Sequence, residues 1–310
     1  MRRAIIVSFL LLGSAANAQS DVCGMSSAFS QPDDGGKKSV AVWSDKSGKA
    51  LLFADTMNIN TDGTRRSYSV DDFWGEKTAL NNLCNAMSDG CAGLTSDQLR
   101  TRRIATQQAK VNGWPAAQIA ATKISPSIIS FKNGKPCPEV DGYLVSATTL
   151  HKAGISNVCD ILNYTDALAV PAIVLPKRAS KGVATPFESR GAQIGDLVVT
   201  MSGDGKLIRY AVAGDMGPSK SLGEISLALA ADLIGKTSSP ANYLEVRGKK
   251  PYQGKGWHVG KTFTLIFPRT KNSAEPYMTR ERIERDAAAA FQQWGGEKRL
   301  RACSAVYKPG

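Results

Sequence analysis

Short apolar segments separated by turn residues recur along most of the chain. Residues 40–43 and 50–53 are apolar, with turn-forming residues 45–48 between them, so this region predicts a hairpin of two strands. The strongest hairpin signal is Ser202-Gly203-Asp204-Gly205, which separates two further apolar segments. From residue 127 onward, the pattern predicts strands at residues 128–131, 172–175, 196–201, 207–213 and 263–267.

Helical spacing of apolar residues is found in a few other segments. Thr95 or Ser96 is a candidate N-cap, and Gly235 and Gly295 are candidate helix ends. The helices do not alternate regularly with the strands, which disfavours a doubly wound parallel sheet, and many short strands favour a barrel or a sandwich. We therefore expect a mainly β (α+β) fold with peripheral helices, the helices covering residues 76–87, 95–110, 224–234 and 279–294.

The N-terminus has the pattern of an export signal. Arg2 and Arg3 precede an apolar run from Ile5 to Leu12, and Ala16-Asn17-Ala18 fits a small-x-small cleavage site. The run is too short for a membrane-spanning helix, and no later stretch is long and apolar enough. We expect a Sec-type signal peptide cleaved after Ala18 and a mature protein that is secreted or periplasmic, with no membrane span.

The remaining chain of about 290 residues is long enough for one large domain or two small ones. Residues 19–38 are polar and predict a flexible N-terminal arm. Residues 39–270 contain most of the predicted strands and form the expected main domain. Residues 271–310 are expected to be a C-terminal helix and tail packed on that domain.

The cysteines predict disulfides. An even number in an exported chain favours structural pairs, and a zinc site is disfavoured because no CxxC pair occurs and only two histidines are present. Sequence alone leaves the pairing open. The separations suggest Cys84 with Cys91 and Cys137 with Cys159, and elimination then leaves Cys23 with Cys303 to tie the two ends of the chain together.

The chain is strongly basic. The formal net charge is +12, and removal of Arg2 and Arg3 with the signal peptide leaves 12 − 2 = +10. Such a charge attracts anionic polymers. The basic residues are scattered, without a dense run interleaved with aromatics, so a basic solvated surface is favoured over a nucleic-acid groove. We expect no nucleic-acid partner, no cofactor and a monomer.

Candidate chemistry is densest in residues 194–234. Asp215 follows an apolar strand between glycines that permit a tight turn, and Glu224 lies nine residues further on. Two carboxyl groups are the minimum for cleaving a glycosidic bond, since one protonates the leaving oxygen and the other activates water or attacks the sugar. The structural alternative is that Asp215 caps a turn and Glu224 caps a helix.

This segment resembles the chitosanases of glycoside hydrolase family 75. In that family a Tyr-Ala-Val-x-x-Asp-x-Gly-Pro stretch and a following Gly-Glu-x-Ser supply the essential Asp and Glu, which fall on Asp215 and Glu224. The resemblance implies that residues 39–270 form a chitosanase-like catalytic domain. The matching residues are Tyr210-Ala211-Val212-Ala213-Gly214-Asp215-Met216-Gly217-Pro218 and Gly223-Glu224-Ile225-Ser226, followed by Leu227-Ala228-Leu229-Ala230.

Two upstream stretches resemble the same family. Residues 170–176 with 195–197 are similar to its core strands, and residues 53–63 are similar to its Asp-rich N-terminal stretch, where Asn58 and Asn60 depart from the pattern. The spacing of Asn58, Asn60 and Asp62 also resembles the start of a calcium loop, but Ser69 stands where the loop needs Glu. The substrate-binding residues expected from these stretches and from aromatic stacking are Asp55, Asp62, Asp196, Tyr210 and Trp257.

The segment is also similar to double-psi β-barrel proteins, including family-45 endoglucanases and rare lipoprotein A. That similarity implies a double-psi-like six-stranded barrel. It favours Glu224 as the general acid and Asp215 as the base or as a charge that tunes the acid. Asp55 or Asp62 is an alternative base, brought in from the first strands of the barrel.

Three functions remain open. The resemblance implies an exported endo-hydrolase that cleaves β-1,4 linkages in chitosan by inversion. Chitosan is cationic, however, and the mature chain is also positive, which favours peptidoglycan glycan strands, cleaved by a muramidase or lytic-transglycosylase reaction. The third possibility is a non-catalytic glycan-binding protein of the envelope.

Overall fold

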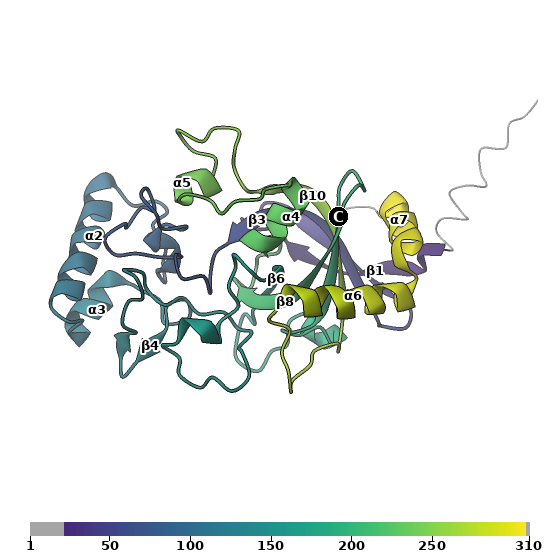
Figure 1. Ribbon diagram of the computed structural model, residues 1–310, viewed down its shortest axis with the longest axis horizontal. Helices are drawn as coiled ribbons and strands as arrows, with labels where there is room; N and C mark the ends of the chain where they lie inside the picture. Colours follow the sequence, from purple (N-terminus) through teal and green to yellow (C-terminus); the bar gives the residue numbers. More distant parts are fainter. Residues whose placement is uncertain (1–21, 308–310) are drawn as a thin grey trace, which may run out of the picture.

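A closed β-barrel forms the centre of the computed structural model, which describes residues 22–307 (Figure 1). Its strands are hydrogen-bonded in the order β3, β10, β7, β8, β6, β9, and β9 pairs back onto β3. These strands are β3 (Leu51–Asn60), β6 (Ala172–Pro176), β7 (Leu197–Ser202), β8 (Ile208–Gly217), β9 (Glu224–Ser226) and β10 (Val259–Phe267). The expected six-stranded, double-psi-like barrel is confirmed.

Two parallel strand pairs distinguish this barrel from a simple meander. β3 pairs with β9 and β6 pairs with β8 in parallel, whereas the other ladders of the barrel are antiparallel. Since parallel strands end on the same side, β6 and β8 finish together, with Pro176 beside Gly217. The strand ends that meet there form the rim of the site described below.

Further strands extend the sheet beyond β3. Residues 25–32, expected within a flexible arm, instead form a strand that pairs antiparallel with its neighbour. The arm is therefore ordered from this point, because its backbone groups complete the ladder of the sheet edge. The additional strands are β1 (Met25–Pro32) and β2 (Ser39–Asp45), and a small separate hairpin consists of β4 (Phe131–Lys132) and β5 (Lys135–Pro136).

The barrel strands are apolar on successive residues because they are covered on both sides. Leu51, Leu52 and Phe53 of β3 are each at most 1% exposed. Helices α4 and α6 pack against β8 and enclose it from outside. The helices of the described residues are α2 (Ser96–Val111), α3 (Ala116–Thr122), α4 (Leu227–Ile234), α5 (Tyr243–Val246), α6 (Arg280–Trp294) and α7 (Gly296–Val306).

The helix predictions succeeded where local capping was clear. Thr95 caps α2 through a reciprocal capping box with Gln98, and α6 lies as predicted. The helix predicted at residues 76–87 is wrong. There the carboxylate of Asp72 accepts the backbone N–H groups of residues 76–79, which holds the chain in a loop, and only a 3₁₀ turn forms at Leu83–Ala86.

Two further helix boundaries differ from the prediction. The helix expected at residues 224–234 begins only at Leu227, because Glu224–Ser226 form β9 and the Ser226 hydroxyl caps α4. At the other end of the chain, Gly295 closes α6 as expected. A helix not predicted, α7, then follows directly from Gly296.

All three suggested disulfides are present, joining Cys23 to Cys303, Cys84 to Cys91 and Cys137 to Cys159. Such bonds are typical of exported proteins. The predicted signal peptide lies outside the described residues. Between residues 22 and 307, none of the helices combines the length and apolarity needed to cross a bilayer.

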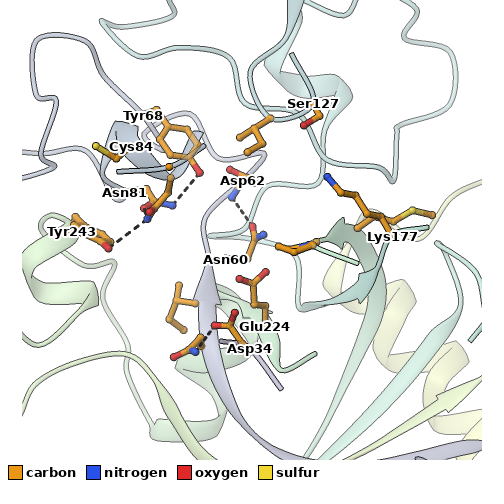
Figure 2. Close-up of a pocket in the computed structure, with 18 of the residues that line it drawn as sticks. Asp34, Asn60, Asp62, Tyr68, Asn81, Cys84, Ser127, Lys177, Glu224 and Tyr243 are labelled. Atoms are coloured by element: carbon orange, nitrogen blue, oxygen red, sulfur yellow. Dashed lines mark hydrogen bonds between the residues drawn. The ribbon is translucent and has the colours of Figure 1, made fainter. Parts of the chain in front are cut away.

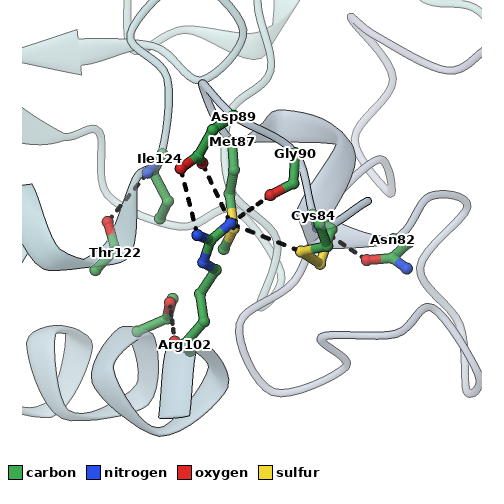
Figure 3. A network of polar contacts seen from close by, with 10 residues as sticks. Asn82, Cys84, Met87, Asp89, Gly90, Arg102, Thr122 and Ile124 are labelled. Atoms are coloured by element: carbon green, nitrogen blue, oxygen red, sulfur yellow. Dashed lines mark hydrogen bonds and ion pairs between the residues drawn. A yellow bond between two sulfur atoms is a disulfide. The ribbon is translucent and has the colours of Figure 1, made fainter. Parts of the chain in front are cut away.

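Arg102 of α2 holds the Cys84–Cys91 loop against the helix (Figure 3). Its guanidinium donates to the backbone carbonyl of Gly90 and pairs with the Asp89 carboxylate at 3.2 Å. Cys84 and Gly90 line the cleft described below, so this contact positions one wall of the cleft.

The two ends of the chain should depend most on the longest disulfide. In the chain-entropy account, replacing Cys23 and Cys303 together by serine lowers the free energy of unfolding by about 5 kcal/mol, because the closed loop is long. The matched Cys84 and Cys91 double variant closes a loop of seven residues and should lose about 2 kcal/mol. Guanidinium unfolding checks the order, and equal losses would contradict it.

Candidate functional site

A cleft of about 460 Å³ opens at the end of the barrel where β3, β6 and β8 finish and β9 begins (Figure 2). Its lining is polar. Acidic and amide side chains come from the barrel, and the opposite wall comes from residues 68–90 and α5. The main polar residues are Asp34, Asn58, Asn60, Asp62, Tyr68, Asn81, Asn85, Lys177, Glu224, Tyr243 and Arg247.

Glu224 enters the cleft from the first residue of β9. The parallel ladder places it beside Asn58 of β3. Gly223 has a φ of +102° and passes so close to β3 that a Cβ there would lie 2.7 Å from the Thr56 carbonyl oxygen. Gly217 makes room on the other side, where a Cβ would lie 3.3 Å from Glu224 Oε2. Gly223 thus allows the chain to approach β3 closely, and Gly217 leaves the space that the Glu224 carboxyl group occupies.

A β-bulge in β8 sets the direction of the Asp215 side chain. The β6–β8 register runs from Ala213 opposite Ile173 to Asp215 opposite Val174, which leaves Gly214 as the extra residue. Asp215 Oδ1 accepts hydrogen bonds from the Thr149 backbone N–H at 2.8 Å, the Thr149 hydroxyl at 2.9 Å and the Met216 N–H at 2.8 Å.

Asp215 and Glu224 lie on strands two apart. Ile173 of β6 pairs antiparallel with Ile225 of β9, so Val174 lies between the two acidic residues. Two strand spacings correspond to roughly 10 Å between their backbones. Long side chains can close part of that distance.

Asp62 follows the end of β3 and joins the same centre. Its backbone N–H donates to Asn60 Oδ1 at 2.7 Å, which turns the chain toward the cleft. Asp62 also borders a small cavity of about 10 Å³, which it shares with Asp215. Asp215 lines this small cavity, whereas Asp62 lines both the small cavity and the cleft.

Burial of several acidic groups together controls their protonation. Burial raises the pKa of Glu224 to about 7, and the charges of Asp34 and Asp215 act in the same direction. Burial likewise raises the pKa of Asp215 to about 6, although the bonds from Met216 and Thr149 oppose it. Burial, and then the charge of Asp215, raises the pKa of Asp62 well above its usual range.

Two polar side chains partly stabilise the Asp62 carboxylate. The Tyr68 hydroxyl and the Asn60 amide both lower the pKa of Asp62, against the effect of burial. Asn81 donates to the Tyr68 oxygen at 3.1 Å and orients it. Figure 2 shows Asp62 and Glu224 on either side of Asn60, and Asn60 also lowers the pKa of Glu224.

Of the seven residues predicted for the site, the structure brings Asp62, Asp215 and Glu224 together. Asp55 lies just outside the cleft, where its Oδ2 packs against Gly223 and has no hydrogen-bond partner in the described chain. Burial raises the pKa of Asp55 to about 6.

The other three predicted residues lie elsewhere. Asp196 is 0% exposed and accepts the N–H groups of Gln193, Thr270 and Lys271, which ties β7 to the chain after β10. Tyr210 packs on Phe291 of α6. Trp257 is 2% exposed and donates its indole N–H to Glu245.

Several lining residues were not predicted as site residues. Asn58 and Asn60 were noticed only as departures from a family pattern. Asp34 comes from the supposed arm, where it accepts bonds from the Asn58 amide and the Ser221 hydroxyl. Tyr68 had no sequence signal, because it reaches the cleft only through the fold of its loop.

The calcium interpretation has no support in the backbone, since β3 continues through Asn60 and gives a strand where a loop is needed. Within residues 22–307, no three His, Cys, Asp or Glu side chains are grouped so as to hold a metal ion.

Comparison of the sequence with protein-family models and with curated proteins found no match. The fold and the geometry of the cleft therefore define the class: a double-psi-like barrel with three clustered carboxyl groups at one end.

Replacing Asp34 by Asn should lower the pKa of Glu224, since the Asp34 charge is the second cause of its elevation. The value should remain above the usual 4.5, because burial is the larger cause. A ¹³C titration of the Glu224 carboxyl carbon measures this, with Asp97→Asn on exposed α2 as the control. An unchanged midpoint in Asp34→Asn would contradict the assigned cause.

Proposed function

We propose that this protein is an exported, endo-acting glycoside hydrolase that cleaves β-1,4 linkages in an amino-sugar polysaccharide, with chitosan as the first substrate. The observation that carries the proposal is the meeting of Glu224 with two further carboxyl groups at an open polar cleft. Glycosidic hydrolysis needs carboxyl groups of different protonation in one site.

Glu224 is the general acid in this proposal. With a pKa of about 7, its carboxyl group keeps a proton at a pH where an ordinary glutamate has lost it. Its carboxyl group lines the cleft directly, within reach of a bound polymer. Glu224 would give its proton to the glycosidic oxygen as the bond to the sugar breaks.

A second carboxylate supports hydrolysis over a lytic reaction. A lytic transglycosylase needs one acid/base group, whereas an inverting hydrolase needs another carboxylate to activate water, roughly 6.5–9.5 Å from the acid. Here Asn60 separates Asp62 from Glu224 across the cleft. Inversion is also the stereochemistry that the resemblance to family-75 chitosanases implies.

The lining of the cleft suits an amino-sugar polymer. Amide side chains of Asn58, Asn60 and Asn85 can donate to and accept from sugar hydroxyl groups. Asp34 lies beside Glu224 in Figure 2 and adds a negative charge close to the reaction centre. An ammonium group of a glucosamine unit would be attracted to this acidic centre.

Peptidoglycan is the second candidate substrate, favoured by a basic segment, the basic rim, that begins at the cleft with Arg247. The segment from α5 to β10 contains no acidic residue between Arg247 and Lys261, and its basic side chains are exposed. No ion pair of the described residues includes them. The basic rim consists of Arg247, Lys249, Lys250, Lys255 and Lys261.

Replacing Glu224 by Gln should reduce reducing-end release by about 10²- to 10⁴-fold, because the acid is lost while the shape is kept. The wild-type rate should fall as the pH rises above about 7, where Glu224 loses its proton. The assay uses chitosan and purified peptidoglycan side by side.

Asp97→Asn serves as the matched control, since Asp97 is exposed on α2 and lies outside the cleft. Release equal in wild type and Glu224→Gln would refute the acid assignment. Binding of a polymer without release of any fragment by wild type would favour the glycan-binding alternative.

The basic rim should decide between the two polymers. Replacing Arg247, Lys249 and Lys250 together by Gln should raise the KM for peptidoglycan about tenfold, since attraction of its carboxylates is lost. The same variant should bind chitosan equally well or better. The control removes three exposed cations that do not line the cleft, Lys46, Lys132 and Lys298. Equal effects of both triple variants would show that only net charge matters.

A further inference from the structure

We propose that Asp62 is the residue that removes the proton from the attacking water, and that Asp215 is a positioning residue that acts through Asp62. The inference rests on the proposed glycoside hydrolase function. The family resemblance assigns the two catalytic roles to Asp215 and Glu224. The inference assigns them to Asp62 and Glu224 instead.

Access to the cleft separates the two aspartates. Asp62 lines the cleft together with Glu224, and it also lines the small cavity behind. Asp215 lines only the small cavity of about 10 Å³, which is the size of a single water molecule. A polymer in the cleft would therefore meet Asp62 before it could approach Asp215.

The hydrogen bonds of the two carboxylates also distinguish Asp215 from Asp62. Three donors from Thr149 and Met216 converge on one oxygen of Asp215 and fix its orientation. In contrast, Asp62 Oδ1 is buried and has no hydrogen-bond partner among residues 22–307. A buried carboxylate oxygen left without a donor is costly and calls for an explanation.

The neighbouring charge makes Asp62 a better base. Burial and the charge of Asp215 raise the pKa of Asp62 well above its usual range, so its ionised form binds a proton more strongly than an ordinary carboxylate but is present only at a pH above that raised pKa. Asp215 is the first charge among the causes, ahead of Glu224. Asp215 thus strengthens the base without touching the substrate.

The reaction balances with water as the only co-reactant. Glu224 gives its proton to the glycosidic oxygen, and the bond from that oxygen to the sugar carbon breaks. A water molecule forms the new bond to that carbon from the opposite face, while Asp62 takes one of its protons. Glu224 ends ionised and Asp62 protonated, and proton exchange with solvent restores both.

Small-anion rescue identifies which aspartate serves as the base. Asp62→Ala and Asp215→Ala are assayed with and without sodium azide on chitosan, or on purified peptidoglycan if wild type releases reducing ends only there. Azide needs no proton removed, so it replaces water when the base is missing. We expect azide to restore cleavage at least tenfold in Asp62→Ala, with a glycosyl azide product, and not in Asp215→Ala.

The pH profile tests the positioning role of Asp215. Asp215→Asn removes a negative charge, which lowers the pKa of Asp62, so Asp62 stays ionised to lower pH. The acidic limb of kcat should therefore move to lower pH, with a reduced maximum. Asp215→Glu restores the charge and should return the limb toward its wild-type position. A merely structural role would change the rate without moving the limb.

The outcomes are distinct. Rescue of Asp215→Ala, rescue of neither variant, or near-wild-type activity of Asp62→Ala would overturn the inference while Glu224→Gln remains inactive and the proposed function stands. Failure of wild type to cleave either polymer would remove the proposed function and this inference with it. Melting temperatures of both variants, compared with Asp97→Asn, separate loss of the base from loss of the fold.

Discussion

The parallel pairing of β3 with β9 is the constraint on which the rest of the structure depends. It closes the barrel, and in the same three residue pairs it places Asn58 beside Glu224 and Asn60 beside Ser226. Only glycine fits at position 223, where the two chains approach most closely. The same strand pairing therefore closes the barrel and brings the carboxyl groups together, since Asp62 follows β3 directly.

Several acidic groups held together in a partly buried place repel one another, and the raised pKa values of Asp62 and Glu224 record that repulsion together with burial. The raised pKa of Asp215 records burial. A fold that keeps such an arrangement accepts a local loss of stability at its site. The rigid surroundings compensate: apolar strands covered on both sides, and loops tied by disulfides and by Arg102. The wall of the cleft is consequently fixed from outside the barrel.

Acidic groups gather at the centre of the cleft, although Lys177 and Arg247 also line it. The centre holds Asp34, Asp62 and Glu224, whereas the basic rim projects from the segment between α5 and β10. A polymer that fits both regions has amino-sugar units at the centre and tolerates or carries negative groups further along. In the proposed function, this arrangement lets a chain of net charge +12 attract a cationic sugar to the acidic centre of its cleft.

The sequence alone determined the features that depend on local pattern: most of the short strands of the barrel, the capped helix after Thr95 and the segment that contains Asp215 and Glu224. Only the tertiary structure decided which side chains meet. It brought Asp62, Tyr68 and Asp34 to Glu224, moved Asp196, Tyr210 and Trp257 into packing roles, and turned the predicted helix at residues 76–87 into a loop around Asp72. The physical reason is the distance along the chain over which each kind of interaction acts. Periodicity and capping act over a few neighbouring residues, whereas the cleft arises from strand pairings and hydrogen bonds between residues far apart in the chain.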